Sequence, residues 1–576
     1  MITYLFSRPW FACVFALLLA ACGGARESAA PQASTGQVVP AATTGAQVSF
    51  YAASRFADQV SFGATPVLVA DIRAKGLEKW IDEQLALPLT PIDMRGAEAV
   101  YAYGFNTTVP REINSYLETE FGRQAASAPD QLRLRVMWSL SQFLVAGATK
   151  GEAPGHVNWV NLLYSHAFGR YGALLREVSV DGHMAHYLDN DQNRPKSAEC
   201  PTCAPNENYA RELLQLFSIG VFKLNPDGTP QRDNRGRYIE TYSQNDVEEL
   251  ARVLTGWERD RLPSNRPARN WGNWGKPMVP STWPPNRDSG AKRVLGKDFP
   301  AGQGAAKDLD DTVELLLAHP NTAPFVALRL IQHLVKSDPT PDYVARVAAR
   351  FRNNGAGVVG DLKAVVKAVL VDAEARRGDN PGAAGAAAVA AVTAVAAHSD
   401  GKFREPFLYS MALWRGLSCT RLPKDTGGGN VFSRTQRPFA PDSVFSFYAP
   451  TDRAPGSNLL APEQRLLTAE EMRNRLGLPE WPSLWNSDTR QRSYANYAAA
   501  GCNIDEWRAA FEQSPRAFND LLSARFFRGA MPPTLRSTVE QMMNEPNPPW
   551  NRLDAQEGAL RMLGFVLATP YFGVLK

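Results

Sequence analysis

The chain has 576 residues, of which 44% are hydrophobic and 21% are charged, with 43 glycines and 42 prolines. Glycine and proline together stay well below the share of roughly 25–30% that marks low-complexity chains, which excludes collagen-like and wholly disordered proteins. The 62 basic and 58 acidic side chains nearly balance, so we expect no nucleic-acid partner. A chain of this length allows roughly two to four domains and an ample core.

The first residues are typical of a secretory signal peptide. Residues 1–22 read MITYLFSRPWFACVFALLLAAC, in which Arg8 is the only charged side chain and the apolar stretch from Trp10 to Ala21 spans twelve residues. A helix that crosses a bilayer needs about twenty apolar residues, so this stretch is the core of an export signal rather than an anchor. We therefore expect residues 1–21 to be removed on export.

The cysteine at the end of this segment predicts a lipid anchor. The run Leu19-Ala20-Ala21-Cys22-Gly23 resembles the lipobox of bacterial lipoproteins, which are cut before the cysteine and acylated on it. A signal peptide with an incidental cysteine is the alternative. We expect Cys22 to be the lipidated first residue, and the resemblance implies that Gly23 favours sorting to the outer membrane. Residues 22–48 are small and polar, which is typical of a flexible tether.

Four further cysteines remain once Cys13 and Cys22 are set aside: Cys200, Cys203, Cys419 and Cys502. An even number in an oxidising compartment indicates disulfides. Of the three possible pairings, we favour Cys200 with Cys203 and Cys419 with Cys502. The Cys-Pro-Thr-Cys spacing is also found in redox pairs, because it can lower a thiol pKa, but no thioredoxin-like strand and helix surround it. We favour a staple within a loop.

Helical periodicity dominates the rest of the chain, so we expect a mainly α fold. Thr65-Pro66 and Thr340-Pro341 each place a capping residue before a proline at the first helical position. Gly76 interrupts the first of these helices, and Asn353-Asn354-Gly355 ends the second. Further helices are predicted at residues 131–147, 158–176, 360–375, 402–418, 463–475, 505–525 and 552–569.

Strand patterns are few. Residues 221–224, a turn at 225–228 and a return at 238–242 predict a small β-hairpin. Residues 258–306, rich in Trp, Pro, Arg and Gly, form a segment too long for an ordinary connection. We expect a multi-helix globular domain with long irregular loops. Its helical core is predicted at residues 49–377, a low-complexity Ala/Gly-rich insert at 378–400, and a second helical part of the same domain at 401–576.

Several long motifs follow one another along the chain. They are Tyr187 to Asn190 (YLDN), Asn206 to Gly220 (NENYARELLQLFSIG), Tyr242 to Trp257 (YSQNDVEELARVLTGW), His319 to Val335, Thr340 to Arg376, Gly401 to Pro406 (GKFREP) and Ala440 to Pro450. These stretches resemble the bacterial Domain of Unknown Function 1800 family. The resemblance implies a large, exported, mostly helical protein of unestablished activity. Because members are often encoded beside a sulfatase-like exported family, Domain of Unknown Function 1501, it also implies a sulfatase-like partner.

The chain departs from that family at two places. Many members carry Trp-His-Asn-His-Phe where this chain has Trp138-Ser-Leu-Ser-Gln-Phe143. Many also have His-Asp where this chain has Arg287-Asp288, before the shared Lys292 and Leu295-Gly296. If the family histidines bind a metal, this protein lacks several of the ligands, so we do not expect a shared histidine-based metal mechanism here.

An acidic motif is the first candidate site. At 100° per residue, the helix from Asn206 places Glu207, Arg211 and Glu212 on a polar face opposite Tyr209 and the leucines. An exposed face with a Glu207–Arg211 pair explains this spacing. The family motif favours a structural ion network instead, in which these groups lie beside Asp189 and Asp246.

A metal or catalytic site built from these carboxylates is the third alternative, because clustered carboxylates need a cation or a shared proton. The candidate ligands for a divalent metal cofactor are Asp189, Glu207, Glu212 and Asp246. The candidate catalytic residues are Glu207, Glu212 and Asp246, together with Arg211, which would hold an anion. Ser243 with Asp246 also fits an N-terminal capping pair.

The tryptophan-rich loop is the second candidate site. Trp271, Trp274 and Trp283 alternate with basic residues that include Arg287. Exposed aromatic and basic groups suit sugars or anionic polymers, whereas a loop that folds back would use its tryptophans to cover the domain surface.

Two functions of different class remain open. In the preferred one, the protein is a membrane-tethered binding or assembly component of the envelope, anchored by its acyl chains. In the alternative, it is an envelope enzyme acting on a polymer or cell-surface substrate through Glu207, Glu212, Asp246 and Arg211. We prefer the first because the sequence has no G-x-S-x-G elbow, phosphate-binding loop or dinucleotide fingerprint.

Overall fold

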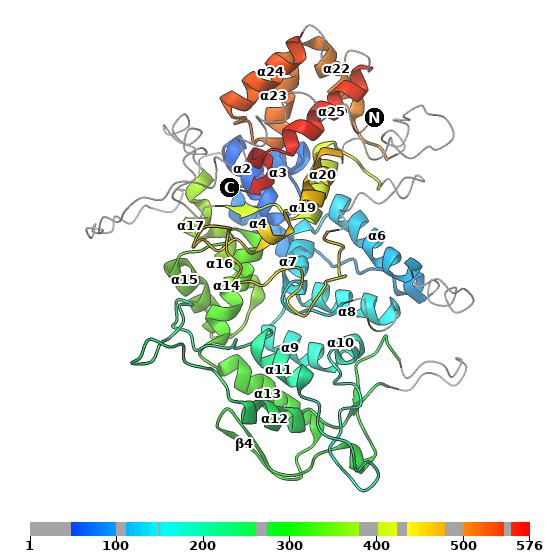
Figure 1. The fold of residues 1–576 in the computed structure, drawn as a ribbon, viewed down its shortest axis with the longest axis vertical. Coiled ribbons are helices and arrows are strands. Elements are labelled where there is room, and N and C mark those ends of the chain that lie inside the picture. The colour runs from blue at the N-terminus through cyan, green and yellow to red at the C-terminus, as the bar shows by residue number, and fades with distance from the viewer. Residues whose placement is uncertain are drawn as a thin grey trace.

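A computed structural model describes residues 48–98, 111–147, 150, 153–260, 273–379, 401–422, 435–477, 497, 500–545 and 554–575. The molecule is elongated, and its helices are stacked in three tiers along the long axis (Figure 1). The predicted mainly α fold is confirmed. The predicted signal peptide and most of the tether lie outside the described residues, as does most of the Ala/Gly-rich insert.

The middle tier holds the N-terminal helices and the helices that follow the tryptophan-rich loop. They are α2 (Phe50–Val60), α3 (Pro66–Lys75), α4 (Leu77–Ala86), α6 (Arg111–Ser127), α7 (Gln131–Ser141), α8 (Ala153–His166), α14 (Thr322–Leu334), α15 (Pro341–Arg352), α16 (Leu362–Val371), α17 (Ala373–Arg376), η2 (Arg377–Asp379) and α19 (Pro406–Gly416).

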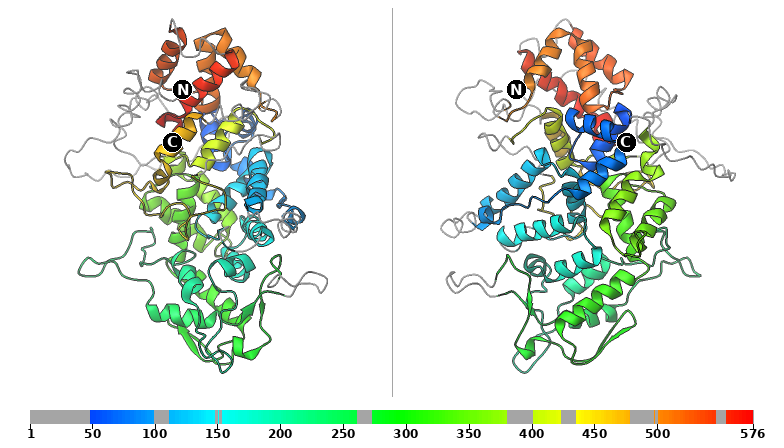
Figure 2. Two further views of the ribbon diagram at one scale, coloured as in Figure 1. Left: turned by 45° about the vertical axis from the view of Figure 1, so that its right-hand side comes forward. Right: turned by 180° about the vertical axis from the view of Figure 1, so that it is seen from behind.

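The lower tier in Figure 1 holds α9 (Tyr171–Val180), α10 (Gly182–Tyr187), α11 (Glu207–Gln215), α12 (Gln244–Val253), η1 (Pro284–Asn286) and α13 (Ala305–Ala318). At the upper end lie α22 (Ile504–Gln513), α23 (Pro515–Phe526), α24 (Pro533–Asn544) and α25 (Ala555–Leu567), which stay together at that end in both views of Figure 2. The elements η4 (Pro462–Leu466), α20 (Ala469–Gly477) and α26 (Pro570–Gly573) complete the C-terminal half.

The described strands form three short antiparallel pairs. These are β1 (Trp257–Glu258) with β2 (Val279–Pro280), β3 (Lys292–Val294) with β4 (Lys297–Phe299), and β5 (Lys402–Phe403) with β6 (Val574–Leu575). In the last pair, Lys402 lies opposite Leu575. This pair ties the end of the chain to the segment that precedes α19.

Capping explains the helix starts that the sequence predicts. The Thr65 side chain accepts a hydrogen bond from the Leu68 backbone at the start of α3, and Thr340 does the same for Tyr343 at the start of α15. Gly76 has a φ of 81°, a backbone conformation that glycine adopts at no steric cost, and it separates α3 from α4. These local predictions are confirmed.

Several predicted helices differ in extent from the observed ones. Those predicted over 360–375, 463–475 and 505–525 are each divided into two shorter elements, namely α16 and α17, η4 and α20, and α22 and α23. The helix predicted over 131–147 ends at Ser141, and the one predicted over 158–176 is divided into α8 and α9. The division lies where Tyr171 donates its backbone N–H to the Gly360 carbonyl at 2.8 Å. Because this partner is remote in sequence, periodicity in a local window does not reveal the break.

The predicted hairpin is present in a modified form, and we call residues 221–241 the arm. Phe222 bridges to Glu240, Leu224 to Pro230 and Arg232 to Tyr238, all antiparallel. The chain therefore reverses direction twice rather than once. The first turn, after Asn225, pairs Leu224 with Pro230, and the second turn pairs Arg232 with Tyr238. The arm projects from the left side of the molecule in Figure 1, next to α15.

The main core joins elements that are far apart in sequence. The ring of Phe121 in α6 lies 5.6 Å from Trp138 in α7, 5.2 Å from Phe407 in α19 and 4.8 Å from Phe439, measured between ring centroids. The chain beyond residue 401 therefore packs on the N-terminal helices, and the two halves share one hydrophobic cluster.

Both favoured disulfides are present: Cys200 is bonded to Cys203 and Cys419 to Cys502. The first closes a loop of sequence separation 3 just before α11, and the second connects segments 83 residues apart.

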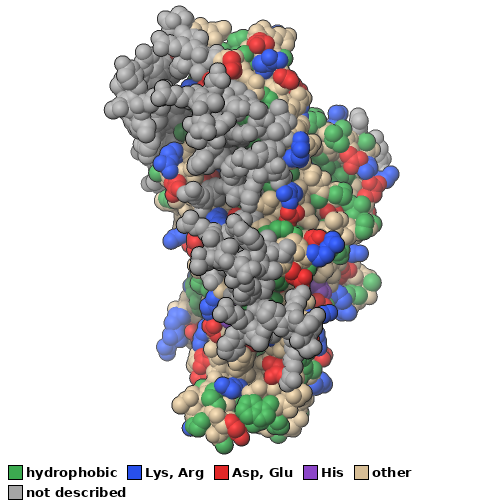
Figure 3. Space-filling view, turned by 90° about the vertical axis from the view of Figure 1, so that its right-hand side faces the viewer, with side chains coloured by type: hydrophobic (Ala, Val, Ile, Leu, Met, Phe, Trp, Pro, Cys, Tyr) green, Lys and Arg blue, Asp and Glu red, His purple; other side chains and the backbone are tan. Residues whose placement is uncertain are grey.

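Among the described residues, no helix has both the length and the apolar character that crossing a membrane requires. On the face drawn in Figure 3, basic and acidic side chains are interspersed, in keeping with the near balance of charge.

Candidate functional site

The polar face of α11 is an exposed ion pair. Arg211 Nη2 lies 2.9 Å from Glu207 Oε2, and both side chains are about 40% exposed. Gln244 of α12 completes the arrangement, because its amide donates to Glu207 at 2.8 Å and its carbonyl oxygen accepts from Arg211 at 3.0 Å. Exposed pairs of this kind contribute about 0–1 kcal/mol to stability. The predicted Glu207–Arg211 contact is confirmed.

Glu212 and Asp246, the other members of the acidic motif, have separate environments. Glu212 is only 8% exposed, burial raises the pKa of its carboxyl, and its Oε2 has no hydrogen-bond partner among the described residues. Asp246 forms a capping box with Ser243 and also accepts the Leu295 backbone N–H at 2.8 Å. Burial acts to raise the pKa of Asp246, but the hydrogen bonds from Ser243 and Leu295 lower it overall.

Asp189 lies at the surface, next to the first turn of α11. Its carboxylate pairs with Lys150 at 2.8 Å and accepts the Asn208 amide at 3.0 Å. The structure therefore brings Glu207 and Arg211 together but does not gather Asp189, Glu212 and Asp246 around them. Within the described ranges, no group of three or more His, Cys, Asp or Glu side chains is placed to hold a metal ion.

The tryptophan-rich loop does not present a continuous aromatic surface among its described residues. Trp274 is 8% exposed and packs on the domain, with the Arg259 guanidinium 4.1 Å from its ring centroid. A Cβ added to Gly155 would lie 2.8 Å from the Trp274 ring, so this glycine allows the close approach. Trp283 is 46% exposed, and Trp271 lies outside the described residues.

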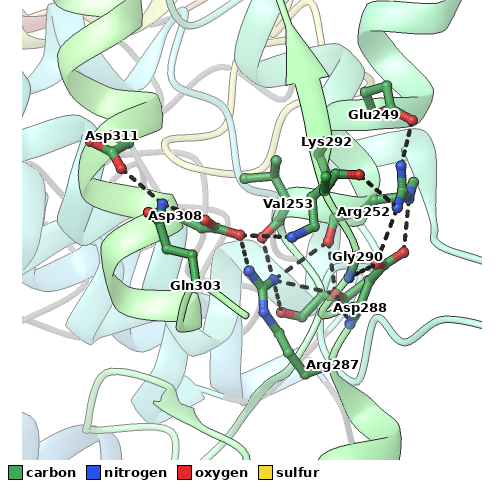
Figure 4. A network of polar contacts seen from close by, with 12 residues as sticks. Glu249, Arg252, Val253, Arg287, Asp288, Gly290, Lys292, Gln303, Asp308 and Asp311 are labelled. Atoms are coloured by element: carbon green, nitrogen blue, oxygen red, sulfur yellow. Dashed lines mark hydrogen bonds and ion pairs between the residues drawn. The ribbon is translucent and has the colours of Figure 1, made fainter. Parts of the chain in front are cut away.

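Arg287 points into the protein rather than toward a ligand. It donates through Nη1 to the carbonyls of Val253 at 2.6 Å and Thr255 at 2.9 Å, and through Nη2 to Asp308. Lys292 Nζ lies 3.1 Å from the same carboxylate, and Figure 4 shows the three side chains meeting. The side chains of Asp308 and Lys292 are fully buried.

The neighbouring Asp288 extends this ion network. Its carboxylate lies 2.8 Å from Arg252 Nε, and Arg252 also pairs with Glu249 at 2.7 Å (Figure 4). Gln303 donates to Asp308 at 2.6 Å. The network joins α12, β3 and α13, so these residues hold the lower tier together, and Arg287 is a member of that framework.

A small cavity lies at the end of α7, beside the segment that departs from the family motif. Ser141, Gln142, His156, Trp159 and Ser446 are among its lining residues. Its volume of about 10 Å³ is about the room that one water molecule needs. Burial lowers the pKa of His156 to about 4, so this imidazole is neutral at pH 7.

A family model described as "Protein of unknown function (DUF1800)" matches residues 55–574. The chain belongs to the DUF1800 family. No curated protein and no solved structure matches it. The structure of this DUF1800 protein shows where the two segments that differ from the family lie. Gln142, in the first segment, lines the small cavity, and Arg287, in the second, belongs to the buried ion network. A guanidinium that stays protonated does not replace a histidine as a metal ligand.

Asn321, which no local pattern in the sequence singles out, organises the root of the arm. Its amide nitrogen donates to the carbonyls of Ile219 at 2.7 Å and Phe222 at 2.8 Å, and its oxygen accepts the Leu224 N–H at 2.9 Å. Asn321 directly precedes α14, where asparagine usually caps a helix, but here it makes no capping hydrogen bond. Asn321 lies in the His319 to Val335 stretch that resembles the family, and this resemblance was the one feature of the sequence that pointed to it.

Proposed function

We propose that this protein is an exported lipoprotein, tethered to the cell envelope through Cys22, that binds another envelope or secreted protein. The lipobox and the polar tether support the anchoring. The two disulfides support an oxidising compartment, because disulfides persist there and are rare in the cytosol. The observation that carries the binding role is the arm.

The arm exposes an aromatic pair with an arginine. Phe222 and Tyr238 are 39% and 44% exposed, with ring centroids 5.0 Å apart. The Arg232 guanidinium lies 4.0 Å from the Tyr238 ring centroid and donates to the Tyr238 hydroxyl at 2.7 Å. Tyrosine and arginine are enriched among the residues that dominate binding energy in protein interfaces. An exposed cluster of this composition therefore suits a protein partner.

The arm is also pre-organised for binding. Asn321 holds its root through three backbone hydrogen bonds, and the Asp233 carboxylate closes its second turn by accepting the N–H groups of Arg235 and Arg237, both at 2.9 Å. A rigid surface loses less conformational entropy on association than a flexible one. The partner that the family resemblance suggests is a sulfatase-like exported protein, and the arm is the surface that we assign to it.

The tether is tested by replacing its sulfur. Cys22→Ser is expected to abolish acylation, measured by incorporation of labelled palmitate, and to release the protein from the membrane fraction, because a hydroxyl does not serve as the acyl acceptor. Cys13→Ser, in the apolar core of the export signal, is the matched control and should change neither result. Unaltered acylation and membrane attachment of the Cys22 variant would refute the anchoring.

The arm is tested by photo-cross-linking in cells with a light-activated amino acid at position 238. We expect a discrete product with one envelope protein, and Phe222→Ala should weaken binding of that purified partner about thirtyfold, since truncating a dominant interface residue costs about 2 kcal/mol. Position 283 is the control, because Trp283 is similarly exposed but lies outside the arm.

Two outcomes would contradict the binding role. One is an equal cross-linking yield from positions 238 and 283, which would show no preference for the arm. The other is a stoichiometric metal in the purified protein that is lost on Glu212→Ala, which would favour the enzymatic alternative.

A further inference from the structure

A second cavity lies between the two halves of the chain, far from the arm. Its lining includes Ser54 and Asp58 of α2, Arg404 before α19, and Arg525 and Arg528 at the end of α23. The volume of about 10 Å³ suits a single group about the size of a water molecule. The cavity therefore joins the first described helix to the C-terminal helices at a site too small for an organic ligand.

Positive charge exceeds negative charge around this cavity. Asp58 is its one acidic lining residue among those described, and it is shared by Arg404 at 3.4 Å and Arg528 at 3.0 Å. Arg525 pairs with Glu506, which is not among the lining residues, at 2.5 Å. Arg528 also hydrogen-bonds the Tyr51 side chain, which is a neutral partner. The carboxylates of Asp58 and Glu506 are therefore shared among three guanidinium groups, and the side chains of Arg404 and Asp58 are no more than 9% exposed.

A further buried cation next to the cavity increases this excess. Arg415 donates to the carbonyls of Gly63 and Ala126, both at 2.7 Å, and within the described part of the chain it forms no ion pair with a carboxylate. Burial lowers the pKa of Arg404, and the attraction of Asp58 offsets this only in part. Buried charges are costly unless a counter-charge and hydrogen bonds compensate them.

Ser54 supplies an independent indication of a ligand. Its side chain is buried at 2% exposure, it lines the cavity, and its Oγ has no hydrogen-bond partner among the described residues. Buried hydroxyl groups in proteins are nearly always hydrogen-bonded. A hydroxyl that faces guanidinium groups across a small space is a donor set suited to an anion.

We propose that this cavity binds a small inorganic anion of the size of chloride. The anion accepts hydrogen bonds from the Ser54 hydroxyl and from the guanidinium groups of Arg404 and Arg528, and it supplies the negative charge that the lining lacks. Because its ligands come from α2, the segment before α19 and the end of α23, the bound anion stabilises the contact between the two ends of the chain.

The test compares thermal unfolding in sodium chloride, sodium bromide and sodium gluconate at one ionic strength. Chloride and bromide are expected to raise the unfolding midpoint saturably, by about 2–3 °C at concentrations one hundred times the dissociation constant, whereas gluconate is too large to enter. Crystals grown in bromide should show an anomalous peak in the cavity. Equal midpoints in the three salts, or an empty cavity in bromide, would overturn the proposal.

Two variants of Ser54 separate an anion site from general packing. Ser54→Asp places a covalently attached carboxylate in the cavity and should remove the chloride response while keeping the midpoint at or above that of the chloride-saturated protein. Asparagine has nearly the same volume as aspartate but no charge. Ser54→Asn should therefore also lose the chloride response, but it should unfold at a lower temperature than Ser54→Asp. The proposal fails if Ser54→Asp retains the chloride response or is destabilised as much as Ser54→Asn.

Discussion

Replacing Asp308 with alanine is expected to lower the free energy of unfolding by about 3–5 kcal/mol, because removing one partner of a buried ion pair leaves an uncompensated charge. Two cations lose their counter-charge at once, since Arg287 and Lys292 share the Asp308 carboxylate. Chemical denaturation followed by circular dichroism measures the effect.

The matched control for Asp308 lies in the neighbouring strand pair. Asp298 pairs with Arg293 at 2.6 Å, but both side chains are more than 60% exposed. Asp298→Ala should therefore cost no more than about 1 kcal/mol. Equal losses in the two variants would show that burial does not govern the Asp308 network, and that Arg287 has another role.

Removing the Cys419–Cys502 disulfide by a double replacement with serine is the second large effect. The bond joins residues separated by 83 positions. On the loop-entropy account, closing a loop of that length restricts the unfolded chain enough to stabilise the native state by about 4–5 kcal/mol. The loss is measured as a shift of the denaturation curve under oxidising conditions.

The other disulfide provides the comparison. Cys200 and Cys203 are separated by 3 positions, so the same account gives only about 2 kcal/mol for their double replacement. A loss equal to or greater than that of the Cys419 and Cys502 variant would mean that the Cys200–Cys203 bond holds more of the fold than its own loop. The loop-staple interpretation would then be wrong.

The candidate site was predictable only where its geometry is local. The Glu207–Arg211 contact follows from helical spacing, and the Ser243–Asp246 capping box follows from the order of residues at a helix start. The same spacing placed Glu212 on the polar face, yet its side chain is 8% exposed. Helical periodicity gives the direction of a side chain but not the element that packs over it, so the burial of Glu212 was not predictable.

The tryptophan-rich loop shows the same limit. Its composition suits both a binding surface and a loop that covers the domain, and the choice depends on Gly155, which leaves room for the Trp274 ring. Similarly, Arg287 looked available for an anion until its guanidinium was found against Asp308. Each outcome depends on a residue remote in sequence, which composition does not identify.

The amino-acid sequence by itself determined the family, the helical class and the helix starts at Thr65 and Thr340, and it favoured the cysteine pairings that the structure shows. Most of these follow from capping, periodicity and proximity along the chain, which act within a few residues. Only the tertiary structure decided which polar groups are buried together, as in the contact of Arg287 with Asp308 and the arginine-lined cavity beside Ser54. Burial and charge compensation arise between segments that meet only after the chain has folded.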